Sequence, residues 1–274
     1  MNEGSVDAPV TGGLRSHEIR LICLNAWGGR LVEPLLAYLR AQRDAADVIA
    51  LQEVFDGADP KSERHGVDRY AGTDLPVVLD LFPRCSAELR GFHAFLSEPY
   101  SSLGERLAVF TRADLAVGET GQSEIHSEIR QEAFGTPFRT HVIAQHVQLS
   151  VGKSRVRVIN THGLWIGGSK GDTPERIRQS ESLRTLIEGF GEPTVLCGDL
   201  NLLPDTESIH ILERGLRNLV VESRIPRTRS EMAPRSKGEF ADYVFVTRDL
   251  MVSSFEAVDI LVSDHLPLAL RFRA

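Results

Sequence analysis

Short apolar runs recur along the chain, and several of them end abruptly on a polar side chain. Runs of this length, bounded by glycine, proline or polar residues, are typical of buried β-strands. We expect strands at 19–25, 47–54, 106–112, 141–150, 155–162, 193–199, 241–246, 254–260 and 266–272. A short segment at 151–154, which contains Gly152, separates two of these runs and predicts a β-hairpin.

Helical periodicity lies between the strands. Leucines spaced as one face of a helix predict a helix over 31–45. A second helix is expected over 172–190, where Thr173 can cap the N-terminus and Pro174 can occupy the first helical position. A third helix is expected near 205–214. This mixture of helices, hairpins and crossovers predicts an α/β or α+β sandwich.

The chain shows neither an internal repeat nor a low-complexity linker, so we expect one domain over 18–274. Residues 1–17 are polar and glycine-rich, which indicates a flexible N-terminal tail. The segment 222–240 is basic and rich in proline and serine. We interpret it as a surface loop within the domain, because strands follow it. Its arginines form either a solvated face or a contact for a polyanionic substrate.

The composition is ordinary for a globular protein: 274 residues, 42% hydrophobic and 25% charged. A net charge of −7 gives no sign of a broadly basic surface for nucleic acid, although a local patch or a bound cation can override it. The three cysteines lack the spacing of a disulfide framework or a zinc site. Neither a secretory signal nor a membrane-spanning run is visible. We therefore expect a cytoplasmic protein; its oligomeric state stays open.

The polar residues at the strand ends are the chemically informative ones. They are Asn25, Glu53, Asn160, His162, Asp199, Asn201, Asp242, Asp264 and His265. Each alone has an ordinary explanation, such as a turn, a cap, a packed histidine or an ion pair. Together they place carboxylates, amides and histidines where α/β folds commonly have their sites. The set therefore favours a functional site.

The chemistry of this set is specific. Carboxylate and amide oxygens without cysteine ligands suit a hard cation such as Mg²⁺ or Mn²⁺. Histidines that titrate near neutral pH can move protons or hold charge at a phosphate. Metal-assisted hydrolysis of phosphoesters uses this combination of a metal ion, carboxylates and histidines.

At these residues the sequence resembles the endonuclease/exonuclease/phosphatase superfamily, which includes deoxyribonuclease I. The motifs "LNAWGG", "LQEV", "NTHGLW", "GDLNLLPD", "DYVFV" and "SDHLPL" follow one another in the family's order. The resemblance covers residues 19–272. It implies an α/β (α+β) fold: a four-layer α-β-β-α sandwich of two mixed sheets flanked by helices.

The resemblance also implies roles for the metal-binding and water-activating residues. Glu53 is similar to the principal metal ligand, with Asn25 beside it. Asp264 is similar to a residue that completes the metal site. Asp199 resembles the aspartate that orients or activates the attacking water, and Asn201 the asparagine that binds the scissile phosphate.

The two histidines resemble a second group of site residues. His265 is similar to the histidine that acts at the phosphate or on the nucleophile, and Asp242 to the aspartate that orients a catalytic histidine. His162 resembles the second histidine, which contacts the phosphate or the leaving group. By a weaker likeness Glu105 is either its partner or a solvated residue at a strand edge.

Three further residues are candidate contacts for the substrate. Asn160 and Arg139 are candidates for the phosphate. Trp165 lies where some relatives recognise their leaving group, whereas core packing is the favoured role for Trp27. Departures from the family pattern are the missing disulfides of the secreted nucleases and the missing basic, aromatic loops of abasic-site nucleases. The second departure argues against a role on duplex DNA.

We therefore expect a Mg²⁺- or Mn²⁺-dependent phosphoesterase, foremost a phosphodiesterase or nuclease, whose partner is a phosphodiester substrate such as nucleic acid. The alternatives are a phosphatase, a phospholipase of the sphingomyelinase type, an inositol-phosphate hydrolase, or an inactive binding domain of the same fold. The residues do not decide the substrate, the number of metal ions or the general base.

Overall fold

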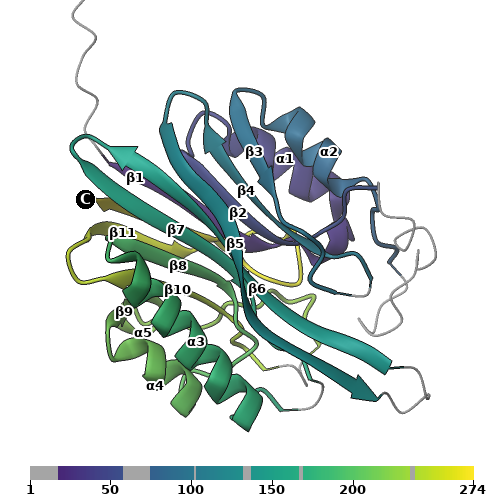
Figure 1. Cartoon of the computed structure of the whole chain (residues 1–274). Coiled ribbons are helices and arrows are strands. Elements are labelled where there is room, and N and C mark those ends of the chain that lie inside the picture. Colours follow the sequence, from purple (N-terminus) through teal and green to yellow (C-terminus); the bar gives the residue numbers. More distant parts are fainter. Residues whose placement is uncertain (1–17, 58–74, 102, 132–136, 167–168, 235–237) are drawn as a thin grey trace, which may run out of the picture.

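Two six-stranded sheets pack face to face, with helices on both outer surfaces (Figure 1). The computed structural model describes residues 18–57, 75–101, 103–131, 137–166, 169–234 and 238–274, with the backbone alone for 129–131 and 137–140. The predicted tail at 1–17 lies outside the described residues, and the division into tail and domain stays a prediction.

The first sheet has the strand order β11-β12-β1-β2-β4-β3. Its strands are β1 (Ile19–Asn25), β2 (Val48–Val54), β3 (Phe92–Leu96), β4 (Arg106–Arg112), β11 (Met251–Ala257) and β12 (Leu268–Arg273). β1 and β2 run parallel, and the other neighbours run antiparallel. The sheet is therefore mixed.

The second sheet has the order β5-β6-β7-β8-β10-β9. Its strands are β5 (Ala116–Gln131), β6 (Pro137–Val151), β7 (Ser154–His162), β8 (Thr194–Asp199), β9 (Leu216–Asn218) and β10 (Asp242–Thr247). It is also mixed, because β7 and β8 run parallel while the other pairs are antiparallel.

The helices form the outer layers. They are α1 (Val32–Gln42), α2 (Leu81–Glu88), α3 (Pro174–Phe190), α4 (Glu207–Glu213) and α5 (Leu219–Glu222), with a short 3₁₀ helix at Trp27–Gly29. α1 and α2 cover the first sheet, and α3, α4 and α5 lie on the side of the second (Figure 1). The predicted four-layer sandwich is confirmed.

The central strands read as unbroken apolar runs because both of their faces are buried. In β1, Leu21 and Cys23 pack between the two sheets, whereas Ile22 and Leu24 pack against α1 and α2. The predicted helix 172–190 is confirmed as α3. Thr173 accepts a hydrogen bond from the Arg176 amide at its N-terminus.

Several elements were not predicted: α2, β3, β5, β9 and α5. β5 is long but polar, and it lies at the edge of its sheet, where none of the strands in the described part of the chain pairs with its outer flank. Because such a strand buries little apolar surface, its pattern carries no strand signal. None of the helices in the described part of the chain combines the length and apolarity needed to cross a membrane.

The two parallel strand pairs position the site. Their carboxyl ends place Asn25 at the end of β1, Glu53 near the end of β2, and His162 beside Asp199 at the ends of β7 and β8. β10 then adds Asp242, which is the antiparallel partner of Asp199. β1 and β2 pack against β7 and β8, so the polar ends of both sheets meet at one edge of the sandwich.

Candidate active site

Asp199 lies at the centre of the polar cluster and is 1% exposed. Its Oδ2 accepts a hydrogen bond from Asn25 Nδ2 at 3.1 Å. The same oxygen lies 3.7 Å from His162 Nε2 and 3.6 Å from His265 Nε2. One carboxylate oxygen therefore faces an amide from the first sheet and two imidazoles.

The backbone at the end of β8 is shaped for this placement. Gly198 has φ 146°, and a Cβ there would lie 1.9 Å from the Thr161 carbonyl oxygen, so a side chain cannot be accommodated. Asn201 adopts φ 54°, and its backbone N–H donates to Asp199 Oδ1 at 2.8 Å. The backbone conformation of the "GDLN" segment thus fixes the position of the Asp199 carboxylate.

Asn25 and Glu53 form the side of the cluster contributed by the first sheet. Asn25 Nδ2 donates to Glu53 Oε1 at 2.8 Å, and Asn25 Oδ1 accepts from the Trp27 amide at 2.9 Å. The pairing of β2 with β4 shifts register between Leu51 and Val54, and Glu53 in this bulge has φ 54°. Bulges commonly re-aim a side chain beside an active site.

His265 is held from both ring nitrogens. Its Nδ1 lies 2.9 and 2.8 Å from the two carboxylate oxygens of Asp242, and its Nε2 lies 2.5 Å from Arg229 Nη1. Because a guanidinium can only donate, Nε2 is the acceptor and Nδ1 carries the proton toward Asp242. Arg229 Nη2 also donates to Asp264 Oδ2 at 2.6 Å.

His162 has a different environment. Its Nε2 lies 3.2 Å from Glu53 Oε1, and its ring stacks on Tyr100 with centroids 5.2 Å apart at 17°. The Tyr100 hydroxyl accepts a hydrogen bond from the Glu53 amide at 3.2 Å. Tyr100 thereby braces both the histidine and the acid that contacts it.

The acidic groups and histidines of the cluster shift one another's pKa values. Burial alone would raise the pKa of Glu53, but the hydrogen bond and charge of His162 and the Asn25 amide outweigh it and lower that pKa to about 2. Against the same effect of burial, His265 and His162 hold the pKa of Asp199 well below its usual range. Burial lowers the pKa of His162, but Glu53 and Asp199 raise it to about 9. Both carboxylates are therefore ionised at neutral pH.

Asp242 responds differently to the same surroundings. Burial raises the pKa of its carboxyl group, although the neighbouring His265 opposes the rise. Its oxygens are both engaged by the His265 ring, so it offers that ring a fixed acceptor.

Most of the predicted site residues come together. The cluster contains Asn25, Glu53, His162, Asp199, Asn201, Asp242, Asp264 and His265. Glu105 lies close enough for its charge to contribute to the raised pKa of His162.

The structure does not bring Asn160 to this cluster. Asn160 is fully buried between the sheets, where its Nδ2 donates to the Leu51 carbonyl at 3.0 Å and its Oδ1 accepts from Gln52 at 2.6 Å. The expectation that it contacts the phosphate is therefore wrong for this arrangement, because both ends of its amide are used inside the core. Trp165 is 48% exposed beyond β7. The side chain of Arg139 lies outside the described residues.

Three residues at the site were not predicted there. Arg229 lies in the segment interpreted as a surface loop, yet it is 5% exposed together with buried Thr228 and Ser230, so that interpretation is wrong for its centre. Tyr100 carried no signal in the sequence beyond lying close to Glu105 along the chain. Lys170 is buried and donates to the Phe240 carbonyl at 2.8 Å. Its charge helps to lower the pKa of Asp199.

The donor set fits a hard divalent cation. Glu53, His162 and Asp199 offer ligand atoms that all lie within 4.8 Å of one another. Asp264 Oδ1 is buried without a hydrogen-bond partner among the described residues, although the other oxygen of that carboxylate is paired. An unpaired buried carboxylate oxygen is costly unless a cation or water contacts it.

Comparison with known proteins identifies the family. The model of the Endonuclease/Exonuclease/phosphatase family matches residues 22–265. The chain belongs to this family. Members of the Endonuclease/Exonuclease/phosphatase family are divalent-metal-dependent hydrolases of phosphoester bonds. A search of curated proteins finds no match.

Solved structures of the family share this fold. A family protein from Bacteroides thetaiotaomicron is 16% identical with a TM-score of 0.65, covering 93% of this chain and 97% of its own. A mannosyl-6-phosphatase of the same organism is 16% identical with a TM-score of 0.66, covering 93% and 100%. A truncated TDP2 from Caenorhabditis elegans is 15% identical with a TM-score of 0.62, covering 94% and 98%. At these identities the likeness concerns the fold alone.

Proposed function

We propose that this protein is a phosphodiesterase that needs Mg²⁺ or Mn²⁺ and cleaves its substrate by attack of water on phosphorus. The observation that carries the proposal is the position of Asp199 Oδ2, within 3.7 Å of the Nε2 atoms of both histidines. One of these histidines is oriented by Asp242 through Nδ1. A carboxylate flanked by two imidazoles can handle a proton and a developing negative charge at one place.

The metal would be held by Glu53 and Asp264, with Asn25 beside them. Glu53 is ionised, and Asp264 has a buried oxygen that makes no hydrogen bond to the described residues. When bound, the cation supplies positive charge to a phosphate oxygen and lowers the barrier as a Lewis acid. Asn25 keeps Glu53 in place through its Nδ2 hydrogen bond.

Asp199 would orient the attacking water and accept its proton. Its Oδ1 accepts from the Asn201 backbone amide, whereas Oδ2, which accepts from Asn25, faces both histidines and would contact the water. The side chain of Asn201, at φ 54°, would bind the scissile phosphate through its amide.

The two histidines would act on the reacting groups. The Arg229 contact leaves a lone pair on His265 Nε2 and the proton on Nδ1, so His265 would contact the attacking water rather than an anionic phosphate oxygen. His162 lies between acidic groups that favour its protonated form, so it can donate to a phosphate oxygen or to the leaving group. Arg229 and Lys170 add positive charge at the same place.

These buried cations also support a second candidate, a phosphomonoesterase. A phosphate monoester carries about one negative charge more than a diester near neutral pH, consistent with its second ionisation near pH 6. Arg229 and Lys170 give the site two cationic side chains in addition to the histidines, although burial lowers the pKa of Lys170. If they serve a dianionic phosphate, Arg229→Gln should reduce monoester turnover far more than diester turnover.

The test is hydrolysis of bis-p-nitrophenyl phosphate and p-nitrophenyl phosphate, with single-stranded and duplex nucleic acid, sphingomyelin and an inositol polyphosphate beside them. Each substrate is assayed with Mg²⁺, Mn²⁺ or EDTA. We expect metal-dependent cleavage of the diester to exceed that of the monoester. The reverse order would establish the second candidate, and no metal-dependent turnover by a folded protein would refute both.

Substitutions in the polar cluster then test whether its residues catalyse the observed hydrolysis. Asp199→Ala and His265→Ala should each lower activity by at least about 10²-fold on every cleaved substrate. Trp165→Ala is the matched test of substrate recognition, because Trp165 is exposed beyond β7. It should raise KM for a nucleic acid and leave bis-p-nitrophenyl phosphate unaffected if the ring stacks on a base.

A further inference from the structure

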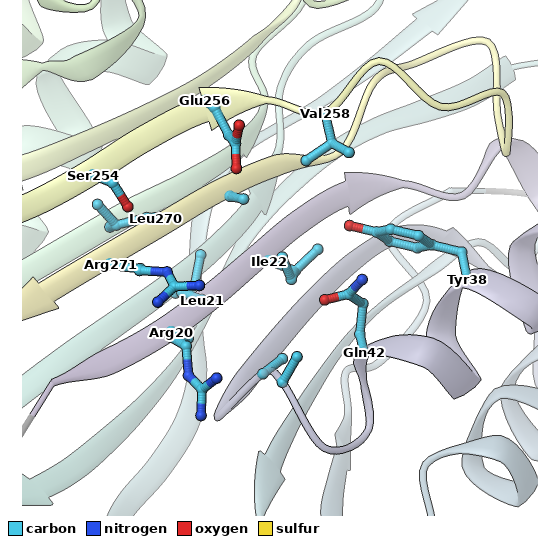
Figure 2. Close-up of a pocket in the computed structure, with 13 residues that line it drawn as sticks. Arg20, Leu21, Ile22, Tyr38, Gln42, Ser254, Glu256, Val258, Leu270 and Arg271 are labelled. Carbon is cyan, nitrogen blue, oxygen red and sulfur yellow. The ribbon is translucent and has the colours of Figure 1, made fainter.

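A second concave site lies on the outer face of the first sheet. It is a cavity of about 200 Å³ between the C-terminal part of α1 and the strands β1, β12 and β11 (Figure 2). Ile22 and Ala269 are direct partners in the β1–β12 ladder, and both line the cavity. Ile22 packs in the cluster on the outer face, opposite the inter-sheet core, so the cavity is separate from the candidate active site.

One end of the cavity is cationic. Arg20 and Arg271 are directly opposed in the β1–β12 ladder, and both line the cavity. Like charges in this relation are destabilising. Asp47 lies 3.6 Å from the Arg20 guanidinium, whereas Arg271 forms no ion pair within 4 Å in the described part of the chain, although its charge helps to lower the pKa of Glu18. This end therefore carries positive charge that the protein balances only in part.

The other end offers hydrogen-bonding groups. Tyr38 is 5% exposed, and its hydroxyl has no hydrogen-bond partner among the described residues. Its ring points into the cavity, near Gln42 of the same helix and across from Glu256 (Figure 2). Burial and then the charge of Glu256 raise the pKa of Tyr38, so the hydroxyl keeps its proton and can donate. Buried hydroxyls rarely lack a partner, which makes this one a ready contact for a ligand.

We propose that this cavity binds a small organic acid that carries a hydroxyl or amino group. Its phosphate or carboxylate would contact Arg20 and Arg271, its carbon chain would lie over Ile22 and Ala269, and its hydroxyl or amino group would meet Tyr38. The pairing of arginine with an acid is charge-assisted and geometrically matched. The volume admits a molecule of a few carbon atoms rather than a polymer.

Isothermal titration with glycerol 3-phosphate and with glycerate tests the site, because the two probes share a polyol body and differ in the acid group. EDTA is present to keep metal away from the candidate active site, and glycerol is the uncharged control. The variants are Arg271→Gln and Tyr38→Phe. The matched control is Arg273→Gln, which removes another outward charge of β12 that is already paired with Glu18 at 3.4 Å.

We expect at least one acid probe to bind and glycerol not to bind. Arg271→Gln should weaken binding at least about tenfold, the change expected for one charge-assisted hydrogen bond. Tyr38→Phe should weaken it several-fold, and Arg273→Gln should leave it unchanged. The proposal is overturned if neither acid binds, if Arg271→Gln binds like the wild type, or if Arg273→Gln weakens binding equally. The last result would indicate nonspecific attraction to a basic strand.

Discussion

The two histidines of the candidate active site lie on either side of one carboxylate and are supported in different ways. His265 is 2% exposed, and hydrogen bonds at both ring nitrogens fix its orientation and its tautomer. His162 is positioned by the flat contact of its ring with Tyr100 and by one contact to Glu53. The contacts of His265 determine which ring nitrogen carries the proton, whereas the contacts of His162 determine mainly the position of its ring.

This difference in support suggests that the two histidines have different roles in proton transfer around Asp199. A histidine of fixed tautomer can act in the same way in each catalytic cycle. A histidine held by stacking and an acid can take or release a proton without losing its place. The predictions below remove these supports one at a time.

The largest effect is expected from His265 itself. His265→Ala should lower kcat by about 10²–10⁴-fold, the range for loss of a positioned proton-handling group. His162→Ala should cost less, because Lys170 and Arg229 still supply charge at the phosphate. The measurement is steady-state hydrolysis of bis-p-nitrophenyl phosphate by both variants. A greater loss in His162→Ala would reverse the proposed roles.

Asp242→Asn tests the support of His265 directly. The amide has almost the shape of the carboxylate, but it has no charge and replaces one of the two acceptor oxygens facing Nδ1 with an NH₂ donor. We expect kcat to fall about 10²-fold with little change in KM, as for an interaction made in the transition state. Circular dichroism controls for folding. An unchanged kcat would show that Asp242 has only a packing role.

The Thr228 hydroxyl holds the backbone at Asp242, so removing this hydroxyl should lower the stability of the protein. Its Oγ1 accepts hydrogen bonds from the amides of Ala241 at 3.0 Å and Asp242 at 3.1 Å. Thr228→Val preserves the shape but leaves both buried amides without this acceptor. The free energy of unfolding should fall by about 1–3 kcal/mol in urea titrations. Thr228→Ser retains the hydroxyl and should lie closer to the wild type.

The smallest effect is expected at Tyr100. Tyr100→Phe removes the acceptor of the Glu53 amide but keeps the ring that stacks on His162. Activity should fall only several-fold, whereas Tyr100→Leu, which also removes the stack, should fall further. Equal activity of the two variants would show that stacking does not position His162.

The main strands and most of the site could be predicted from sequence because their signals are local. Buried strands such as β1 are continuous apolar runs, and the polar residue that ends each run is visible beside it. The parallel pairing of β7 with β8 then brings together residues that are far apart in the chain. The family motifs supplied the order of these strand ends.

The missed features depend on tertiary contacts. Arg229 lies in a polar, basic segment, and only the antiparallel bridge to His265 explains why it is buried. Asn160 and His162 are two residues apart on β7, so both side chains point to the same face, toward β2 of the other sheet. Asn160 lies deeper along the strand, where Gln52 and the Leu51 carbonyl engage its amide, whereas His162 is the last residue of the strand and contacts Glu53. Sequence parity could not separate these two side chains, and nothing local could have placed Arg229.

The central claim is that Glu53 holds a divalent cation for hydrolysis by the groups around Asp199. The most direct measurement is turnover of bis-p-nitrophenyl phosphate as Mn²⁺ is titrated into metal-free wild-type protein and into Glu53→Gln, which keeps the size of the side chain but not its charge. We predict that the wild type is inactive in EDTA and gains activity that saturates with Mn²⁺, while Glu53→Gln stays at least about 10²-fold less active. Turnover that is insensitive to EDTA, or a Glu53→Gln titration that matches the wild type, would contradict the account.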